Sequence, residues 1–244
     1  MSSHPLDGIM SAESHKAWSL ATRIASQRGF YLAGGTGLAL HLHHRRSTDL
    51  DFFLHAPFDP QEILDELQSH DLPVVALNIS HGTLNALCDS VLVQFLSVEG
   101  QSQLSPTSSV DTAEVAAIPD IFAMKLSAVT GRAKLRDYFD LMVIDQQSGY
   151  LIEQGISFYL ERYHPSVPEQ STMTLVRSLG YLDDVVDDET VPVDRRVVVD
   201  FWHSRSVDLA QHLDRYGSFG QDQVPLETPN KGQTPRMRFG KNMR

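Results

Sequence analysis

The apolar pattern of this chain changes near residue 117, and that change limits the folds that the chain can adopt. Before it, short apolar or alternating runs are separated by turn residues, which is typical of strands. After it, apolar residues recur at helical spacing until about residue 216. The sequence therefore predicts an α+β fold, with a mixed sheet of four or five strands flanked by helices and then a helical region.

The same patterns give approximate element boundaries. Expected strands cover 30–33, 49–54, 73–79, 83–87 and 91–96. Expected helices cover 11–27, 37–42, 60–70, 119–130, 134–148, 151–163, 170–186 and 195–216. We expect an α/β domain over 1–117, a helical domain over 118–217 and a flexible basic tail over 218–244, because the tail has five basic and two acidic residues and no periodic apolar pattern.

Charge and composition exclude several classes of protein. The formal net charge is -11, which argues against a uniformly basic nucleic-acid binder but leaves room for a local basic groove. One cysteine, Cys88, excludes an intramolecular disulfide and fits a reducing compartment. The start lacks a basic region followed by an apolar stretch, and no apolar run is long enough to span a membrane. We therefore expect a cytoplasmic protein without a signal peptide or membrane contact.

A glycine-rich junction stands between the first expected strand and the next helix. Residues Gly34-Gly35-Thr36 follow an apolar strand and open a helical pattern. Backbone N–H groups at a helix N-terminus favour phosphate oxygens through direct hydrogen bonds and through the helix dipole. Glycine permits a close approach of the backbone, and Thr36 adds a hydroxyl donor. The three residues predict a phosphate site, although such a tripeptide alone is more often a simple turn.

Two acidic residues follow about 13 positions later on an expected strand. Side chains alternate between the faces of a strand, so the carboxylates of Asp49 and Asp51 point the same way. Two adjacent carboxylates repel each other unless a cation compensates them, and Mg²⁺ prefers oxygen ligands completed by phosphates and waters. The alternative is a solvated strand face. Together with the glycines, the pair predicts phosphoryl or nucleotidyl transfer.

These residues resemble the AbiEii-type nucleotidyltransferase toxins, which belong to the DNA polymerase beta nucleotidyltransferase superfamily. The resemblance rests on Gly34-Gly35-Thr36 with the 45–53 segment Arg-Arg-Ser-Thr-Asp-Leu-Asp-Phe-Phe. A second motif over 125–141, Lys-x-x-Ala-x-x-x-Arg followed by Arg-Asp-x-x-Asp-Leu, is also similar to the family. The resemblance implies that the acid pair holds Mg²⁺ (or Mn²⁺) with a nucleoside triphosphate (NTP), and that the first domain is nucleotidyltransferase-like.

The second motif supplies further candidate site residues. On one continuous helix Lys125, Arg132 and Arg136 would form a stripe with Asp140, although Gly131 leaves two abutting helices as an alternative. The functional interpretation has Lys125, Arg132 and Arg136 bind the nucleotide, with Asp137 and Asp140 in supporting positions. Lys125 is also expected to act in catalysis with Asp49 and Asp51, by stabilising the charge that develops on the leaving pyrophosphate. The competing interpretation is a ladder of helical ion pairs that only steadies the helix.

A third carboxylate is the feature that this sequence lacks relative to the superfamily. The corresponding strand carries Gln94, which cannot ionise and is a poor Mg²⁺ ligand. Asp89 in the preceding turn could substitute, or the acid could come from Asp137 or Asp140, or the enzyme could use a reduced set. Activation of the attacking hydroxyl is therefore the open part of the prediction.

Other polar residues near the motif receive more modest interpretations. We expect His41, His43 and His44 to be partly exposed at a helix end rather than to bind zinc. Either Arg45 or Arg46 is expected to orient a carboxylate or phosphate, and we place Arg46 in the nucleotide site. Cys88 is expected to be a packed strand residue rather than a nucleophile.

The sequence thus predicts a Mg²⁺-dependent nucleotidyltransferase that transfers a nucleoside monophosphate (NMP) from an NTP to a hydroxyl. The resemblance implies an RNA acceptor such as tRNA, a toxin role in a toxin–antitoxin or abortive-infection system, and a separately encoded antitoxin as partner. Two alternatives remain: a catalytically weak nucleotide-binding regulatory module, and a nucleotidyltransferase acting on small molecules such as antibiotics.

Overall fold

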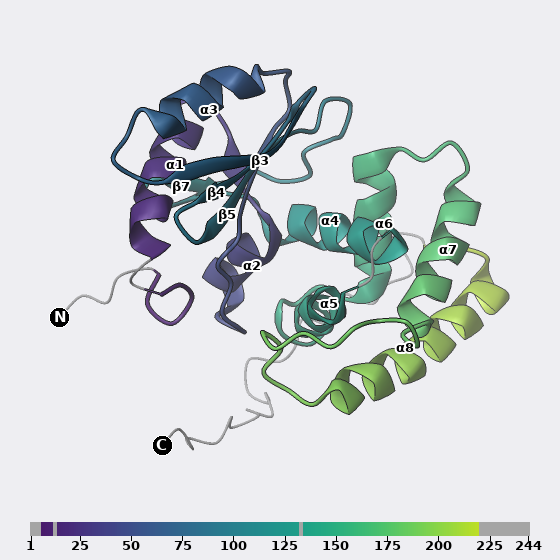
Figure 1. Cartoon of the computed structure of the whole chain (residues 1–244). Helices are drawn as coiled ribbons and strands as arrows, with labels where there is room; N and C mark the ends of the chain where they lie inside the picture. Colours follow the sequence, from purple (N-terminus) through teal and green to yellow (C-terminus); the bar gives the residue numbers. More distant parts are fainter. Residues whose placement is uncertain (1–5, 12–13, 132–133, 220–244) are drawn as a thin grey trace, which may run out of the picture.

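The computed structural model describes residues 6–11, 14–131 and 134–219. The predicted α+β class is confirmed, since a mixed sheet with flanking helices precedes a group of five helices (Figure 1). The helices of the first part are α1 (His15–Gln27), α2 (Gly34–Leu42) and α3 (Pro60–Gln68). The strands are β1 (Tyr31–Leu32), β2 (Leu50–Leu54), β3 (Val74–Ser80), β4 (Thr83–Cys88), β5 (Val91–Ser97), β6 (Ser108–Val110) and β7 (Ala113–Val115).

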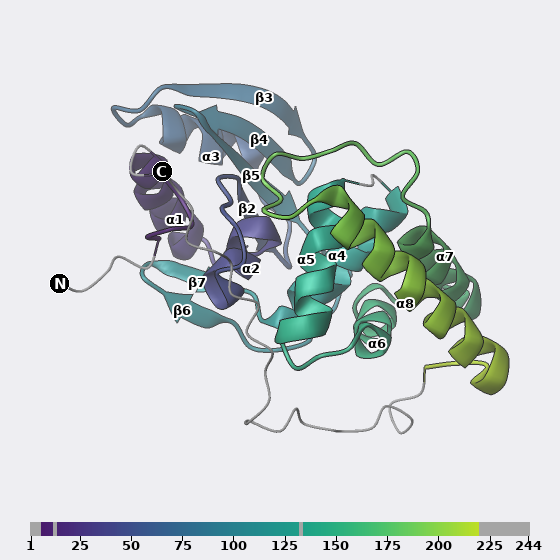
Figure 2. The same cartoon turned by 90° about the horizontal axis from the view of Figure 1, so that it is seen from below.

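The sheet has seven strands, so the prediction of four or five was wrong. Their order is β3-β4-β5-β2-β1-β7-β6, and Figure 2 shows β3 and β6 at opposite edges. The two strands that the sequence missed, β6 and β7, have three residues each, which is too short for a periodic pattern to appear. Strand β2 pairs antiparallel with β1 and parallel with β5, which places the strand that carries Asp51 at the centre of the sheet.

The two faces of the sheet have different partners. Side chains of one face, including Phe52, Val93 and Phe95, form a buried core with apolar residues of α1 and α3. Helix α2 lies on the other side and contacts α4 (Ile118–Gly131) and α5 (Leu135–Gln147) (Figure 1). The acid pair, the glycines and the second motif are therefore gathered between the sheet and the helical group.

The helical group is completed by α6 (Ile152–Tyr163), α7 (Pro168–Gly180) and α8 (Arg195–Tyr216). A second buried core joins these helices to α2 and β1, with Trp202 and Phe139 among its largest members. The prediction that a helix extends from 170 to 186 was wrong, because α7 ends at Gly180 and 181–194 forms a connection without helix.

Two other helix predictions need correction. The second motif does not lie on one helix, because α4 ends at Gly131 and Lys134 has an extended backbone before α5; the alternative of two abutting helices was right. Helix α2 starts at Gly34 rather than at Gly37, so the glycines form its first turn.

Some predictions fall on residues outside the described ranges. Arg132 is one of them, as is most of the predicted tail over 218–244. Within that tail, the structure describes Phe219, whose ring stacks on His212 with 4.9 Å between the centroids. In the part of the chain that the structure describes, no helix is long and apolar enough to cross a membrane.

Candidate active site

One pocket brings together most of the residues that the sequence singled out. It is lined by Gly34, Gly35, Arg45, Ser47, Asp49, Asp51, Phe53, Gln94, Leu96, Ile121, Met124, Lys125, Ala128, Arg136 and Asp137. These residues come from α2, β2, β5, α4, α5 and the segment before β2. The volume is about 140 Å³, which is below the roughly 300–1,000 Å³ of pockets that enclose a whole ligand. The pocket is therefore sized for part of a ligand.

The glycine turn touches the acid pair directly. Gly34 has a positive φ of 63°, and a Cβ atom at this position would lie 2.1 Å from Oδ2 of Asp51. A Cβ on Gly35 would lie 2.6 Å from Nη2 of Arg45 and 2.9 Å from Oγ of Ser47. A side chain at either position would displace Asp51, Arg45 or Ser47, so glycine allows the first turn of α2 to approach the carboxylate.

The first turn of α2 presents backbone donors to the pocket. The helix begins at Gly34, and the first N–H to reach the preceding turn belongs to Gly37, which donates to the carbonyl of Ala33 at 2.9 Å. The N–H groups of the three residues before Gly37 have no intrahelical acceptor, as in any helix start. The prediction that the Thr36 hydroxyl binds phosphate was wrong. Its side chain is buried, and its hydroxyl donates to the Asp49 carbonyl.

The acid pair lies at the entrance to β2. Asp51 is in the strand and Asp49 precedes it, and both line the pocket. The Asp49 side chain is 31% exposed, and Nη2 of Arg136 lies 3.4 Å from its Oδ2. Arg136 also lies 3.7 Å from Asp188, which belongs to the connection between α7 and α8. Both distances are long for ion pairs, so Asp49 and Arg136 are held loosely.

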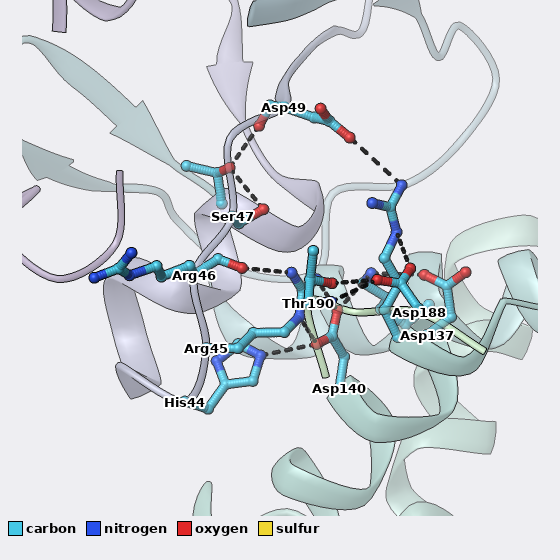
Figure 3. A network of polar contacts seen from close by, with 12 residues as sticks. His44, Arg45, Arg46, Ser47, Asp49, Asp137, Asp140, Asp188 and Thr190 are labelled. Atoms are coloured by element: carbon cyan, nitrogen blue, oxygen red, sulfur yellow. Dashed lines mark hydrogen bonds and ion pairs between the residues drawn. The ribbon is translucent and has the colours of Figure 1, made fainter. Parts of the chain in front are cut away.

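A second acidic residue of the motif, Asp140, is held in the opposite manner. Arg45 donates to both of its oxygens, from Nε at 2.6 Å and from Nη2 at 2.8 Å (Figure 3). Lys125 Nζ lies 2.7 Å from the same carboxylate. His44 Nε2 is 2.8 Å from the same carboxylate. Burial alone would raise the pKa of Asp140, but Lys125, Arg45 and His44 outweigh it and hold the pKa well below its ordinary value.

Lys125 connects this buried cluster to the pocket. Its ammonium group contacts Asp137 and Asp140, each at 2.7 Å, and its side chain is 8% exposed. Burial alone would lower the pKa of Lys125, but the two carboxylates outweigh it and raise the pKa, so the group stays charged. Asp137 keeps one oxygen, Oδ2, that is buried and has no hydrogen-bond partner within the described residues.

The remaining predicted residues have clear positions. Gln94 lies opposite Asp51 in the parallel β2–β5 register, and its amide donates to Asn85 at 2.8 Å. Asp89 lies in the turn between β4 and β5 and does not line the pocket. Arg46 is exposed and does not line it either, whereas its neighbour Arg45 orients the Asp140 carboxylate.

The histidine prediction was wrong for His44. Its side chain is 1% exposed and stacks on Phe139 at 5.9 Å between ring centroids. Its hydrogen bond with Asp140 could not be read from local sequence, because Asp140 lies 96 positions further along the chain. The interpretation of Cys88 was right: it is buried in β4, and burial raises the pKa of its thiol to about 11.

The donor set of the pocket suits a hard divalent cation. Across the described ranges, no group of three or more His, Cys, Asp or Glu side chains is placed to hold a metal ion by itself. A Mg²⁺ ion typically takes one or two carboxylates and completes its octahedron with phosphate oxygens and waters. Asp49 and Asp51 supply that number of carboxylates, beside a helix start that can receive the phosphates.

A comparison with known families matches this part of the chain. The model of the nucleotidyl transferase AbiEii toxin of type IV toxin–antitoxin systems matches residues 19–70, which include the glycine turn and the acid pair. The resemblance to AbiEii is confirmed. An uncharacterized protein of Aquifex aeolicus (strain VF5) is 29% identical over 158 residues, which cover 64% of this chain and 74% of the relative.

Solved structures support the fold beyond the AbiEii segment. A protein of H. pylori assigned as a nucleotidyltransferase has a TM-score of 0.57 at 18% identity, covering 84% of this chain and 98% of that one. The nucleotidyltransferase toxin MenT4 of Mycobacterium tuberculosis H37Rv has a TM-score of 0.52 at 16% identity, covering 90% of this chain and 92% of that one. The AbiEii match supports the predicted enzyme class, a nucleotidyltransferase, and the two solved structures support the fold.

Proposed function

We propose that this chain is a Mg²⁺-dependent nucleotidyltransferase that transfers NMP from an NTP to a hydroxyl on an RNA such as tRNA. The observation that carries the proposal is the contact between the first turn of α2 and the Asp51 carboxylate, with Asp49 in the same pocket. This arrangement places phosphate donors and metal ligands side by side, as the reaction requires.

Each pocket residue has a defined task in this proposal. The backbone N–H groups at Gly34 and Gly35 bind phosphate oxygens. Arg136, which is held loosely by Asp49 and Asp188, exchanges these carboxylates for the triphosphate. Lys125 stays anchored to Asp137 and Asp140 and contributes positive charge at the pocket wall. Arg132 remains a predicted nucleotide-binding residue.

The reaction forms one bond and breaks one. The hydroxyl oxygen of the acceptor attacks the α-phosphorus of the NTP, the bond between the α- and β-phosphates breaks, and pyrophosphate leaves. A Mg²⁺ ion held by Asp49 and Asp51 would neutralise the charge that develops on the phosphates. The small pocket fits the phosphates and the ion, while the base and ribose extend outside it.

The hydroxyl proton needs an acceptor other than Gln94. Asp140 is unsuited because three protein groups occupy it and its pKa is held low. Asp137 is better placed, because it lines the pocket and its Oδ2 has no hydrogen-bond partner in the described part of the chain. We therefore assign the role of the missing third acid to Asp137.

The test is direct transfer of label. The chain is incubated with labelled NTPs, Mg²⁺ and total tRNA, and the variants Asp49→Ala and Asp51→Ala are compared with Asp71→Asn, which changes an exposed acid outside the pocket. The proposal predicts transfer by the wild type and by the Asp71 variant alone, and loss of transfer when EDTA removes the metal. Absence of transfer by the wild type, or equal transfer by all variants, contradicts it.

The family match supports a toxin role and a separately encoded antitoxin as partner. Expression of the wild type should then arrest growth, whereas Asp51→Ala should not. A nucleotidyltransferase of the antibiotic-modifying kind would instead leave growth unaffected and label a small hydroxyl compound.

A second candidate function is a nucleotide-binding module without turnover. The observation that favours it is Gln94, an amide opposite Asp51 where a third acid would stand. Such a module would bind NTP and release no pyrophosphate, whereas the enzyme would release pyrophosphate in step with label transfer.

A further inference from the structure

The outer strands β3, β4 and β5 have an open face beside the active-site pocket. Alternate side chains of these strands, such as Leu84, Ala86 and Val93, are buried in the core with α1 and α3. The other set points to the opposite face, where the side chains of β4 and β5 are half-buried and those of β3 are exposed. Gln94 and Leu96 of this set line the pocket, so the open face is continuous with the site.

Three amide side chains form a row across this face, which we call the amide row. Asn78 of β3 lies opposite Asn85 of β4, and Asn85 lies opposite Gln94 of β5. Gln94 in turn lies opposite Asp51 of β2. The Gln94 amide donates to Asn85 Oδ1 at 2.8 Å, which confirms that the two side chains share one face. The amide row therefore leads from the acid pair to the edge of the sheet.

Apolar side chains accompany the amide row. Val75 lies opposite Leu87, and Leu87 lies opposite Leu92, on the same three strands. Val75 is 58% exposed, although it is a large apolar residue. A surface that combines neutral donors and acceptors with apolar side chains suits a flat heteroaromatic ring, whose edge forms hydrogen bonds and whose face packs on aliphatic groups.

The two sides of the acid pair differ in charge. The side of α2, α4 and α5 carries backbone donors together with Lys125 and Arg136. On the opposite side the segment 74–97 contains one formally charged residue, Asp89, which is in the far turn. Phosphates are therefore favoured on the first side, and a neutral group on the second.

We propose that the amide row binds the unpaired base at the end of a polynucleotide acceptor, so that the terminal hydroxyl reaches the acid pair. Asparagine and glutamine amides both donate and accept, and so match the hydrogen-bonding edges of bases. Strands are about 4.8 Å apart, so the row from Gln94 to Asn78 spans roughly 10 Å, enough for one or two nucleotides. This inference rests on the proposed function and adds where the acceptor lies.

The experiment varies the concentration of total tRNA in the label-transfer assay at saturating NTP and Mg²⁺. Asn85→Ala and Asn78→Ala should each raise the KM for tRNA about five- to tenfold, the effect of losing one hydrogen bond in a binding site. NTP binding measured without tRNA should stay unchanged. Ser90→Ala, in the exposed turn between β4 and β5, is the matched control and should leave both quantities unchanged.

A charged variant of the same size sharpens the test. Asn85→Asp should raise the KM for tRNA more than Asn85→Ala, because it adds a negative charge beside a polyanion. Binding of a short single-stranded RNA, followed by fluorescence anisotropy without NTP, should weaken in the same order.

The possible outcomes separate this inference from the proposed function. If the wild type transfers label to tRNA and both alanine variants keep the wild-type KM for tRNA, the amide row does not bind the acceptor, while the transferase proposal stands. If the wild type labels only a small hydroxyl compound, the polynucleotide acceptor is wrong. If the wild type transfers no label at all, the proposed function fails and this inference fails with it.

Discussion

Two carboxylates that the sequence singled out, Asp49 and Asp140, are held by the fold in opposite ways. The Asp49 side chain is 31% exposed and pairs with Arg136 at 3.4 Å, whereas Asp140 is fully buried and is held by Arg45, Lys125 and His44 at 2.6–2.8 Å. A carboxylate that is saturated by protein donors builds the wall of a site. A loosely held one can exchange its partner for a ligand, so the number and quality of contacts indicates which acid acts on substrate.

The largest expected effect tests the loosely held side of this contrast. Asp49→Asn and Asp51→Asn should each reduce label transfer by about a thousandfold or more, because each removes one of two carboxylates available to the metal. For Asp49→Asn the free energy of unfolding should change by less than about 1 kcal/mol, since the Asp49–Arg136 pair is long and partly exposed. Single-turnover transfer and urea denaturation measure the two quantities. A large loss of stability with retained transfer would reverse the assignment.

Substitution of the fully paired Asp140 should affect stability rather than label transfer. Asp140→Ala should destabilise the fold by roughly 3–5 kcal/mol, because it removes the carboxylate that pairs with the buried Arg45 and one of the two carboxylates that hold Lys125. Urea denaturation measures this loss, and Asp49→Ala serves as the control with an expected loss below about 1 kcal/mol. Equal, small losses for both variants would show that the buried cluster contributes no more than the exposed pair.

The pH dependence of stability separates the two carboxylates again. Because the pKa of Asp140 is well below its ordinary value in the fold, the unfolded chain takes up a proton first as the pH falls. The stability that Asp140 contributes is therefore complete above about pH 5 and is lost as the pH falls below about 4. Urea denaturation from about pH 5 down to about pH 3 should give a steeper fall for the wild type than for Asp140→Asn. Parallel curves would contradict the assignment of a lowered pKa.

The smallest expected effect concerns Arg136, the cation that pairs loosely with Asp49. Arg136→Ala should raise the KM for NTP about tenfold, the effect of losing one charge-assisted contact, with little change in stability. The reason is that Arg136 is 25% exposed and lies 3.4 and 3.7 Å from its two acidic partners. Arg177→Ala, an exposed arginine of α7, is the control. An unchanged KM for NTP would place the triphosphate elsewhere.

The sequence predicted well what depends on neighbours along the chain. The alternation of β5 identified Gln94 as the position beside the acid pair, and the structure places it opposite Asp51. The helix predicted over 60–70 begins at Pro60 as expected, and the Asp59 side chain caps it by accepting from the Gln61 N–H at 2.8 Å. Period-two alternation and capping are local properties, so they can be read from a few residues.

Contacts between distant segments could not be predicted in this way. The partner of His44 is 96 positions away, and Lys125 meets its carboxylates only because α4 and α5 pack as separate helices. Arg45 and Arg46 are neighbours with the same side chain, and only the fold shows that Arg45 turns inward to Asp140. The pattern could name the charged residues of the site but not which of them the protein itself neutralises.

The central claim is that the acid pair and the glycine turn together bind a metal-bound triphosphate, and NTP binding with and without Mg²⁺ tests it most directly. Isothermal titration of the wild type should show that Mg²⁺ strengthens NTP binding. The double variant Asp49→Asn/Asp51→Asn should bind NTP with the same affinity whether or not Mg²⁺ is present. Its midpoint of urea unfolding should equal that of the wild type, which shows that the variant is folded. An equal gain from Mg²⁺ in both proteins would contradict the claim.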